Sequence, residues 1–323
     1  MVIVAGIDEA GYGPLLGPLV VSAAAFRIPE DKVDLCLWRL LGGAVSRKVR
    51  KRGGLVAIAD SKKLYSGLRG KDGLEHLERG VLSMLAAAGR RPASLRDLVG
   101  CLAPAAVQAA ERHPWHAALD LPLPAATGAA GIPLAANALG QALSAAGTGF
   151  LGIRCEPVFA DEFNRMVQAT RNKATTLFDV TCRLILRLWQ ASPGGLVRLY
   201  IDRHGGRMHY LQALQRVFEG CQHKVLREDA DASTYRVTDG RRTMELQFAV
   251  NAEQRHLAVA LASMASKYLR ELFMAQFNRY WQGRLPNLAP TGGYYVDGKR
   301  FLAEIEPEMR RMGLDESVLC RTR

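Results

Sequence analysis

The sequence predicts an α/β fold in which a mixed five-stranded sheet is flanked by helices. Apolar, β-branched runs at 2–7 and 19–26 are typical of strands, and so is the run LVRLYID at 196–202. Helical patterns at 72–88, 161–190 and 253–281 alternate with them. Strands that alternate with helices build a sheet covered by helices, and the 323 residues, 49% of them hydrophobic, suffice for a large core.

Shorter elements complete the expected order. A turn with the sequence GYGPLLGP joins the first two strands, and a short helix follows around 31–41. A helix near 207–219 precedes a strand at 223–227. The runs STYRV and TMELQFAV flank Asp239-Gly240, which is a strong signal for a β-hairpin over 233–250.

Residues 91–149 differ in composition, being rich in Ala, Leu, Pro and Gly with few charges after Arg112. We interpret them as an insertion of short helices and loops within one domain that spans 1–323. The stretch 121–153 has no charge and is long enough to cross a bilayer. Its prolines would break a spanning helix, so no membrane segment is expected.

The composition indicates a basic globular protein. There are 43 Lys and Arg against 31 Asp and Glu, which gives a net charge of +12 and favours a polyanionic partner, either nucleic acid or an acidic membrane surface. Six scattered cysteines show no metal-binding or disulfide spacing, and the first residues lack the basic start of a signal peptide. We therefore expect reduced thiols and a cytoplasmic protein.

Acidic residues stand at the ends of apolar elements. Asp8 and Glu9 end the first strand, Asp202 ends the strand at 196–202, and Glu271 shares a helix face with Tyr268 and Met264. Ligands of α/β sheets lie at the carboxyl ends of strands, and converging carboxylates repel one another unless cations neutralise them. Oxygen ligands favour Mg²⁺ or Mn²⁺, and two such ions suit phosphodiester cleavage.

Simpler interpretations exist for each acid. Asp8 and Glu9 could cap a turn, Asp202 could pair with Arg203, and Glu271 could pair with Lys267 on a solvated face. Gly11 and Gly13 also invite comparison with the dinucleotide fingerprint of oxidoreductases, but the third glycine comes one position late and Pro14 stands where the helix should open. Together, the acids and the glycine turn favour a metal site.

Five segments carry a resemblance to a known family. They are GIDEAGYGPLLGP (6–18), DSKKL (60–64), YID (200–202), ASMASKYLRE (262–271) and TGGYYVD (291–297). In content and order they resemble the type 2 ribonucleases H, the ribonuclease HII family. The resemblance implies a ribonuclease H-like fold and an endoribonuclease that cleaves RNA in RNA–DNA hybrids and at ribonucleotides embedded in DNA. It further implies two-metal-ion catalysis with Mg²⁺ or Mn²⁺, leaving 3′-hydroxyl and 5′-phosphate ends.

The same resemblance assigns site residues. It makes Asp8, Glu9, Asp202 and Glu271 the catalytic, metal-binding acids. It places the glycine turn against the ribose 2′-hydroxyl, Tyr294 on the sugar or base, and three further side chains on phosphates; these substrate-binding residues are Gly11, Tyr12, Gly13, Lys62, Ser263, Lys267 and Tyr294.

Two departures keep a second function open. Tyr12 replaces the arginine of the family's G-R-G turn, so a guanidinium that would contact the nucleic-acid backbone is missing, and Glu271 replaces the usual aspartate. A relative that holds hybrid without cutting it is therefore the alternative. We expect a monomer whose partner is nucleic acid.

The remaining candidates have structural explanations. His113 and His116 are not expected to form a metal pair, and Phe277 and Trp281 are expected in the core. His204 is expected to be a solvated loop histidine rather than a proton shuttle. In the run 47–52, five of six residues are basic, which suits a solvated loop and a backbone-binding loop equally.

Overall fold

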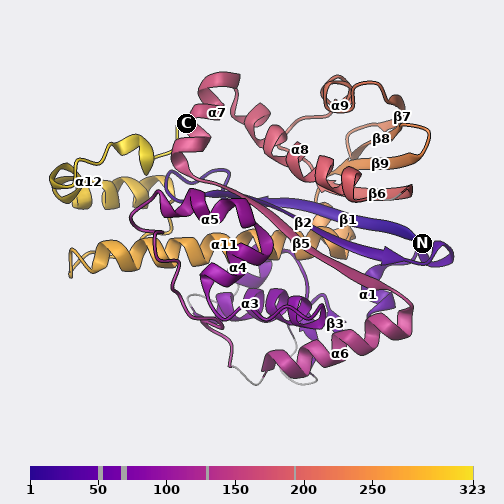
Figure 1. Ribbon diagram of the computed structural model, residues 1–323, viewed down its shortest axis with the longest axis horizontal. Helices are drawn as coiled ribbons and strands as arrows, with labels where there is room; N and C mark the ends of the chain where they lie inside the picture. The colour runs from indigo at the N-terminus through magenta and orange to yellow at the C-terminus, as the bar shows by residue number, and fades with distance from the viewer. Residues whose placement is uncertain (50–53, 67–70, 129–130, 193, 323) are drawn as a thin grey trace.

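The centre of the molecule, seen here in a computed structural model, is a mixed sheet with helices on both faces (Figure 1). The structure describes residues 1–49, 54–66, 71–128, 131–192 and 194–322. Within them the sheet has seven strands in the order β5-β2-β1-β6-β9-β8-β7. Their bounds are β1 Val2–Ala10, β2 Leu19–Ile28, β5 Gly149–Val158, β6 Gly195–Asp202, β7 Gln222–Glu228, β8 Ala232–Thr238 and β9 Arg242–Ala249, and a separate two-stranded sheet joins β3 Val45–Ser46 to β4 Val56–Ala57.

The predicted α/β class with a mixed sheet is confirmed, but the sheet in the described residues has seven strands in place of the five expected. β1 is antiparallel to β2, and β2 to β5, whereas β1, β6 and β9 run parallel as neighbours. β8 and β7 extend this five-stranded part by antiparallel pairing. The expected hairpin at 233–250 is formed by β8 and β9. β5 has no counterpart among the predicted strands, because glycine, arginine and proline interrupt its apolar pattern.

The helices depart from the predicted pattern mainly at their ends. Their bounds are η1 Glu30–Lys32, α1 Leu37–Leu40, α2 Ser61–Ser66, α3 Lys71–Ala87, α4 Leu95–Leu102, α5 Pro104–Glu111, α6 Gly131–Ala146, α7 Ala160–Thr170, α8 Lys173–Ala191, α9 Leu211–Val217, α10 Ala252–Arg255, α11 Leu257–Gln282, α12 Tyr295–Arg311 and η2 Glu316–Val318. The single helix expected at 161–190 is two helices, because Arg171 adopts a left-handed conformation with φ of 51°. The expected helix at 31–41 is reduced to η1 and α1.

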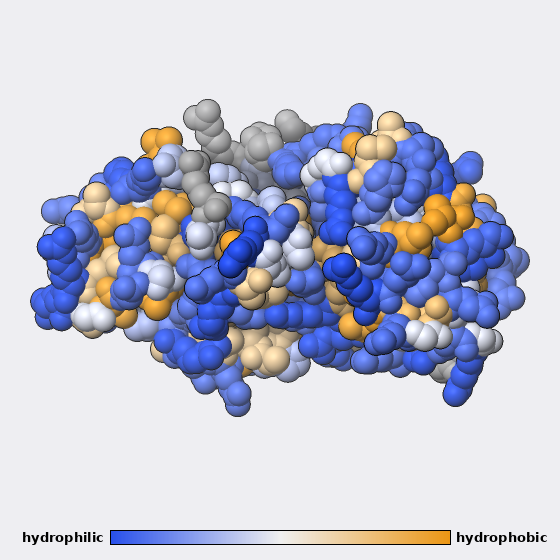
Figure 2. All heavy atoms as spheres, turned by 90° about the horizontal axis from the view of Figure 1, so that it is seen from above, coloured by the Kyte–Doolittle hydropathy of each residue, from blue (hydrophilic) through white to orange (hydrophobic). Residues whose placement is uncertain are grey.

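The surface carries mostly hydrophilic residues on the face shown in Figure 2, with separate hydrophobic patches towards its two ends. No helix in the described part of the chain is long and apolar enough to cross a membrane. The uncharged stretch 121–153 instead contributes α6 and part of β5.

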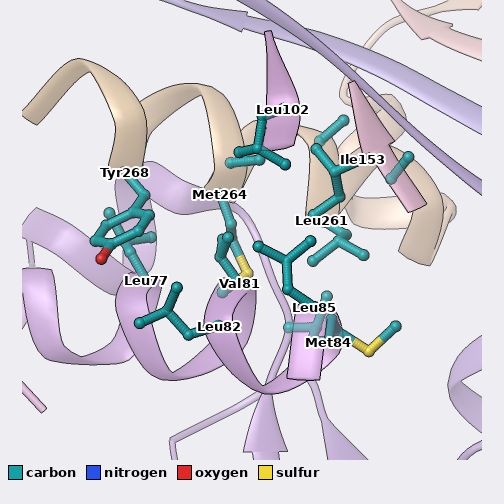
Figure 3. Packing of buried hydrophobic residues seen from close by; sticks show 14 of the residues in the cluster. Leu77, Val81, Leu82, Met84, Leu85, Leu102, Ile153, Leu261, Met264 and Tyr268 are labelled. Atoms are coloured by element: carbon teal, nitrogen blue, oxygen red, sulfur yellow. The ribbon is translucent and has the colours of Figure 1, made fainter. Parts of the chain in front are cut away.

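Two hydrophobic clusters hold the sheet between its helices. On one face, α11 packs against β1 and β2 and also against α3 (Figure 3), where Met264 and Leu261 meet Val81 and Leu85. On the other face, α8 and α9 cover β1, β6, β8 and β9. Gly6 allows α11 to approach β1 closely, because a Cβ there would lie 2.2 Å from the backbone nitrogen of Val259.

A buried carboxylate ties the uncharged stretch to the core. Glu78 on α3 is fully buried and accepts hydrogen bonds from three successive backbone N–H groups, those of Ala125, Ala126 and Thr127, at 2.6–2.9 Å. It also accepts one from the Tyr268 hydroxyl on α11 at 3.0 Å. This single side chain therefore fixes the loop that precedes α6.

An aromatic cluster lies between α5, α7 and α11. Phe277 and Trp281 are buried, as predicted for core residues. His113 and His116 are also buried, within ring-contact distance of Trp115 and Phe159. His113 faces Asp161 with 3.1 Å between Nε2 and Oδ1. Both histidines thus serve in packing.

Candidate active site

Carboxylates gather where three neighbouring parallel strands end. Asp8 and Glu9 lie near the carboxyl end of β1, and Asp202 is the last residue of β6. The third strand, β9, is followed by the short helix α10, which carries Glu253. The carboxyl ends of adjacent parallel strands are where α/β sheets place ligands, so the topology itself assembles this set of acids.

The acids raise one another's pKa. Burial, followed by repulsion from Glu9 and Asp202, raises the pKa of Asp8 well above its ordinary value. Burial and the charge of Asp202 raise the pKa of Glu9 to about 7. Burial, together with the adjacent carboxyl of Glu253, raises that of Asp202 to about 6, against the opposing hydrogen bond from the backbone N–H of Ala252. The cluster therefore carries an excess of negative charge when these acids are ionised, which a bound cation would neutralise.

Hydroxyl groups and one lysine surround the cluster. Ser263 on α11 is buried, and its hydroxyl donates a hydrogen bond to the Asp8 carboxyl. The same hydroxyl lies 2.9 Å from that of Ser61 at the start of α2. Its hydroxyl is therefore engaged within the protein. Lys62 is exposed, and although partial burial lowers its pKa, the charges of Asp8 and neighbouring acids outweigh this and raise it. Lys62 thus stands at the solvent side of the acids.

The donor set fits a hard divalent cation. It consists of carboxylate oxygens, whose mutual repulsion a divalent ion would relieve. Glu253 is 9% exposed, and its Oε2 is buried without a hydrogen-bond partner, which leaves this oxygen able to bind a cation. As they stand, no three His, Cys, Asp or Glu side chains in the described ranges are arranged to hold a metal ion. The chemistry of the acids, rather than a closed coordination shell, supports the assignment.

Glu271 lies in a different environment from the other predicted acids. It pairs with Lys267 at 2.6 Å and with Arg270 at 3.2 Å, and it accepts a hydrogen bond from the Tyr65 hydroxyl at 2.9 Å. Burial and Glu271 together raise the pKa of that tyrosine. The main charges that act on Asp8, Glu9 and Asp202 do not include Glu271. The structure therefore does not bring Glu271 into the cluster, which instead contains Glu253, a residue that was not predicted from the sequence.

The glycine turn follows the acids directly. Gly11 has φ of 85°, and a Cβ on it would lie 2.6 Å from both the Arg270 side chain and the carbonyl oxygen of Pro18. Gly13 has open space around it. The turn leads into the antiparallel strand β2 and not into a helix. The dinucleotide fingerprint, which places a helix N-terminus after its glycines, is therefore absent here.

Two buried arginines donate hydrogen bonds to backbone carbonyl groups of the glycine turn and of the segment beside it. Arg270 is 1% exposed and donates to the carbonyl oxygens of Leu16 at 3.2 Å and Gly292 at 3.0 Å. Arg321 is 2% exposed and donates to the carbonyl oxygen of Pro14. Burial and the nearby charge of Arg270 lower the pKa of Arg321 to about 9.

The segment before α12 is joined to the same turn. The carbonyl oxygen of Gly293 accepts hydrogen bonds from the backbone N–H groups of Leu15 and Leu16 at 2.8 and 3.1 Å. The next residue, Tyr294, is 58% exposed, with its ring 6.0 Å from the Arg270 guanidinium. The structure thus places Tyr294 beside the glycine turn.

One further prediction is wrong, and another lies partly outside the described residues. His204 is buried at 4% exposure, with Nε2 3.3 Å from the Thr181 hydroxyl, so the expected solvated loop histidine is wrong. Burial and the charge of Arg207 lower its pKa to about 4. Of the basic run 47–52, residues 50–52 lie outside the described residues, while Arg47 lies over the Trp38 ring at 4.0 Å and donates to the carbonyl oxygen of Gln254.

Comparison with known proteins gives one partial sequence match. Ribonuclease HII of Thermofilum pendens (strain DSM 2475 / Hrk 5) is 35% identical over an alignment of 98 residues, and the match covers 25% of this chain and 44% of that protein. The match therefore spans less than half of the relative's length. No family model matches the chain.

Solved structures give only distant likenesses. The ribonuclease HII in a PCNA complex from Archaeoglobus fulgidus matches with a TM-score of 0.43 and 18% identity over 99% of this chain and 94% of that one. A Bst-RNase HIII bound to Mn²⁺ matches with a TM-score of 0.45 and 14% identity, over 99% of this chain and 66% of that one. Ribonuclease H2 of Pyrococcus horikoshii OT3 matches with a TM-score of 0.41 and 13% identity, over 98% of this chain and 92% of that one. All three TM-scores lie below 0.5. Over the matched part, and in the order of its motifs, the chain is similar to the type 2 ribonucleases H.

Proposed function

We propose that this protein is a divalent-metal-dependent endoribonuclease that hydrolyses the RNA strand of RNA–DNA hybrids and cuts at ribonucleotides embedded in DNA. The proposed products carry 3′-hydroxyl and 5′-phosphate ends. The observation that carries the proposal is the group of acids at the ends of β1, β6 and β9, directly before a glycine turn. The sequence relationship to ribonuclease HII supports the choice of substrate.

The acids would hold the metal ions. Asp8, Glu9 and Asp202 keep their proposed roles, and Glu253 takes the fourth place that the sequence analysis gave to Glu271. Two bound Mg²⁺ or Mn²⁺ ions would activate the attacking water and stabilise the charge on the leaving oxygen. Ser263 would orient Asp8 through its hydrogen bond.

The remaining groups would bind the nucleic acid. Gly11 and Gly13 let backbone approach the ribose, where a 2′-hydroxyl distinguishes RNA from DNA. Tyr294 has an exposed ring beside the turn for stacking on a sugar or base. Lys62 would meet a phosphate at the solvent side of the acids, and Lys267, paired with Glu271, lies further along α11.

The same proposal treats 1–323 as one catalytic domain with an insertion at 91–149. The helices of that segment share their hydrophobic cluster with α11 and the sheet. The bonds of Glu78 to the loop at 125–127 add a polar link to the same core. These contacts support one folding unit.

Cleavage of two labelled substrates tests the proposal. Purified protein with Mg²⁺ or Mn²⁺ should cut an RNA–DNA hybrid and a DNA duplex with one ribonucleotide, and EDTA should stop both reactions. Glu253→Gln should lower kcat about a hundredfold or more, since ligand loss exceeds the effect of losing an outer-shell partner. Glu271→Gln is the matched variant and should change kcat less than tenfold.

Three outcomes would contradict parts of the proposal. A protein that binds hybrid but cuts neither substrate with any divalent ion would be the non-cleaving relative. Loss of activity in Glu271→Gln with activity kept in Glu253→Gln would return the fourth acid to position 271. Cleavage that persists in EDTA would exclude dependence on a divalent metal.

A further inference from the structure

We propose that Lys173 supplies, beside the glycine turn, the backbone-binding cation that the resembling family carries as arginine at the position of Tyr12. The ligand of Lys173 would be a phosphate of the nucleic-acid strand that the turn receives. This inference rests on the proposed function. It gives Tyr12 the task of holding the lysine rather than that of stacking on a nucleotide.

The contact between the two side chains carries the inference. The Lys173 Nζ lies 5.3 Å from the centroid of the Tyr12 ring and 5.6 Å from that of Phe163 on α7. An ammonium group within about 6 Å of an aromatic ring is attracted to the ring face. Tyr12 itself is half-buried and packs against the hydrophobic cluster beneath α7 and α8. Its ring is therefore a fixed platform for the ammonium group.

The start of α8 fixes the backbone of the lysine. Asn172 caps the helix, with its Oδ1 accepting from the backbone N–H groups of Ala174 and Thr175 at 2.9 and 3.0 Å. Lys173 is the first helical residue, two positions after the left-handed Arg171. The amino end of a helix of 19 residues adds partial positive charge in the same place. The break between α7 and α8 thus places the ammonium group of Lys173 beside the glycine turn.

The position of the turn indicates which group the cation would meet. Tyr12 is close enough to Glu9 for that carboxylate to raise the pKa of the tyrosine, after burial itself. The lysine therefore stands near the acids that would hold the metal, on the side of α8. A strand whose ribose faces Gly11 and Gly13 brings its phosphates within reach of a side chain flanking the turn. An ammonium group binds a phosphate as a compact point charge.

Variants that remove the positive charge of Lys173, or that place a positive charge at position 12 instead, test the inference. Lys173→Met should weaken binding of an RNA–DNA hybrid in EDTA about three- to tenfold, and it should reduce the slope of log K against log salt by about one. Lys173→Arg should behave like the wild type. Adding Tyr12→Arg to Lys173→Met should restore binding and slope, because the cation then comes from the turn. Lys32→Met, which lies beyond the opposite end of β1, is the matched control and should change neither quantity.

The possible failures are distinguishable. If the wild type cleaves hybrid and Lys173→Met keeps both affinity and slope, the inference is overturned and the proposed function stands. If the double variant binds no better than Lys173→Met, a cation at the turn is not what was lost. If the wild type neither binds nor cleaves hybrid, the proposed function fails first. Thermal unfolding of each variant separates loss of binding from loss of fold.

Discussion

Glu253 and Glu271 show how differently two glutamates on consecutive helices can be used. Glu271 stands in a motif and on an inward-facing helix stripe, which is the signal that selected it. Lys267 and Arg270 neutralise it, so it needs no metal ion. Glu253 stands in the polar run NAEQRH, where periodicity gives no information. The usable signal was its place just after a strand parallel to β6, and that pairing is visible only in the fold.

Glu9 provides a pH-dependent prediction for the metal-free protein. Its pKa of about 7 lies above the ordinary value of 4.5, so the fold disfavours the carboxylate form. This cost is nearly absent below pH 4.5, grows between pH 4.5 and 7, and is fully present above pH 7. Glu9→Gln removes it. In EDTA at pH 8 the variant should be more stable than the wild type by roughly 1 kcal/mol or more, or about 2–4 °C in Tm.

Urea unfolding at pH 8 and pH 4.5 measures the effect. The advantage of Glu9→Gln should become small at pH 4.5, where the glutamate is protonated in the native state and about half-protonated in the unfolded chain. Saturating Mg²⁺ at pH 8 should cancel or reverse it, because only the wild type retains the full ligand set. A Glu9→Gln variant that is less stable than the wild type in EDTA at pH 8 would contradict the prediction.

At the level of elements, the sequence predicted what hydrophobic patterning controls. β1, β2 and β6 are apolar runs, and α3 and α11 repeat apolar residues at helical spacing, so all five were expected. β5 is an edge strand with mixed composition, and its strand form comes from pairing with β2. The break at Arg171 was also invisible, because a left-handed non-glycine residue has no reliable sequence signal.

The loop at 125–127 shows a second kind of element that sequence alone does not reveal. Its three N–H groups converge on Glu78, 47 residues or more away in the chain. Glu78→Gln keeps one acceptor oxygen and brings an NH₂ group against N–H donors. We expect a loss of about 2–4 kcal/mol in the free energy of unfolding, since buried groups lose charged partners.

Chemical unfolding and limited proteolysis test the role of Glu78. Cleavage of the native Glu78→Gln variant should appear within 112–133 before it appears elsewhere, because the loop is released first. Glu75→Gln, on the same helix, is the matched control and should stay within about 0.5 kcal/mol of the wild type. Equal stability and equal protease resistance for both variants would show that the hydrogen bonds to Glu78 add nothing.

For the molecule as a whole, the net charge of +12 predicts how the affinity for nucleic acid depends on salt. Four acids are withdrawn from the surface into one cluster, and bound divalent ions would make the protein more positive still. Binding of hybrid should therefore weaken steeply with salt, about a thousandfold between 50 and 200 mM if six phosphates are contacted. Fluorescence anisotropy of a labelled hybrid measures this, and affinity independent of salt would contradict a mainly electrostatic interface.

The support beneath the glycine turn has a consequence for synthesis of the protein. The turn is made well before its hydrogen-bond partners, which come from α11, from Gly292 and Gly293, and from Arg321. A chain still emerging from the ribosome would hold Asp8 and Glu9 without a formed turn beside them. The proposed recognition of a ribonucleotide would then arise only after Arg321 has been made, since each of these partners must be present for the turn to form.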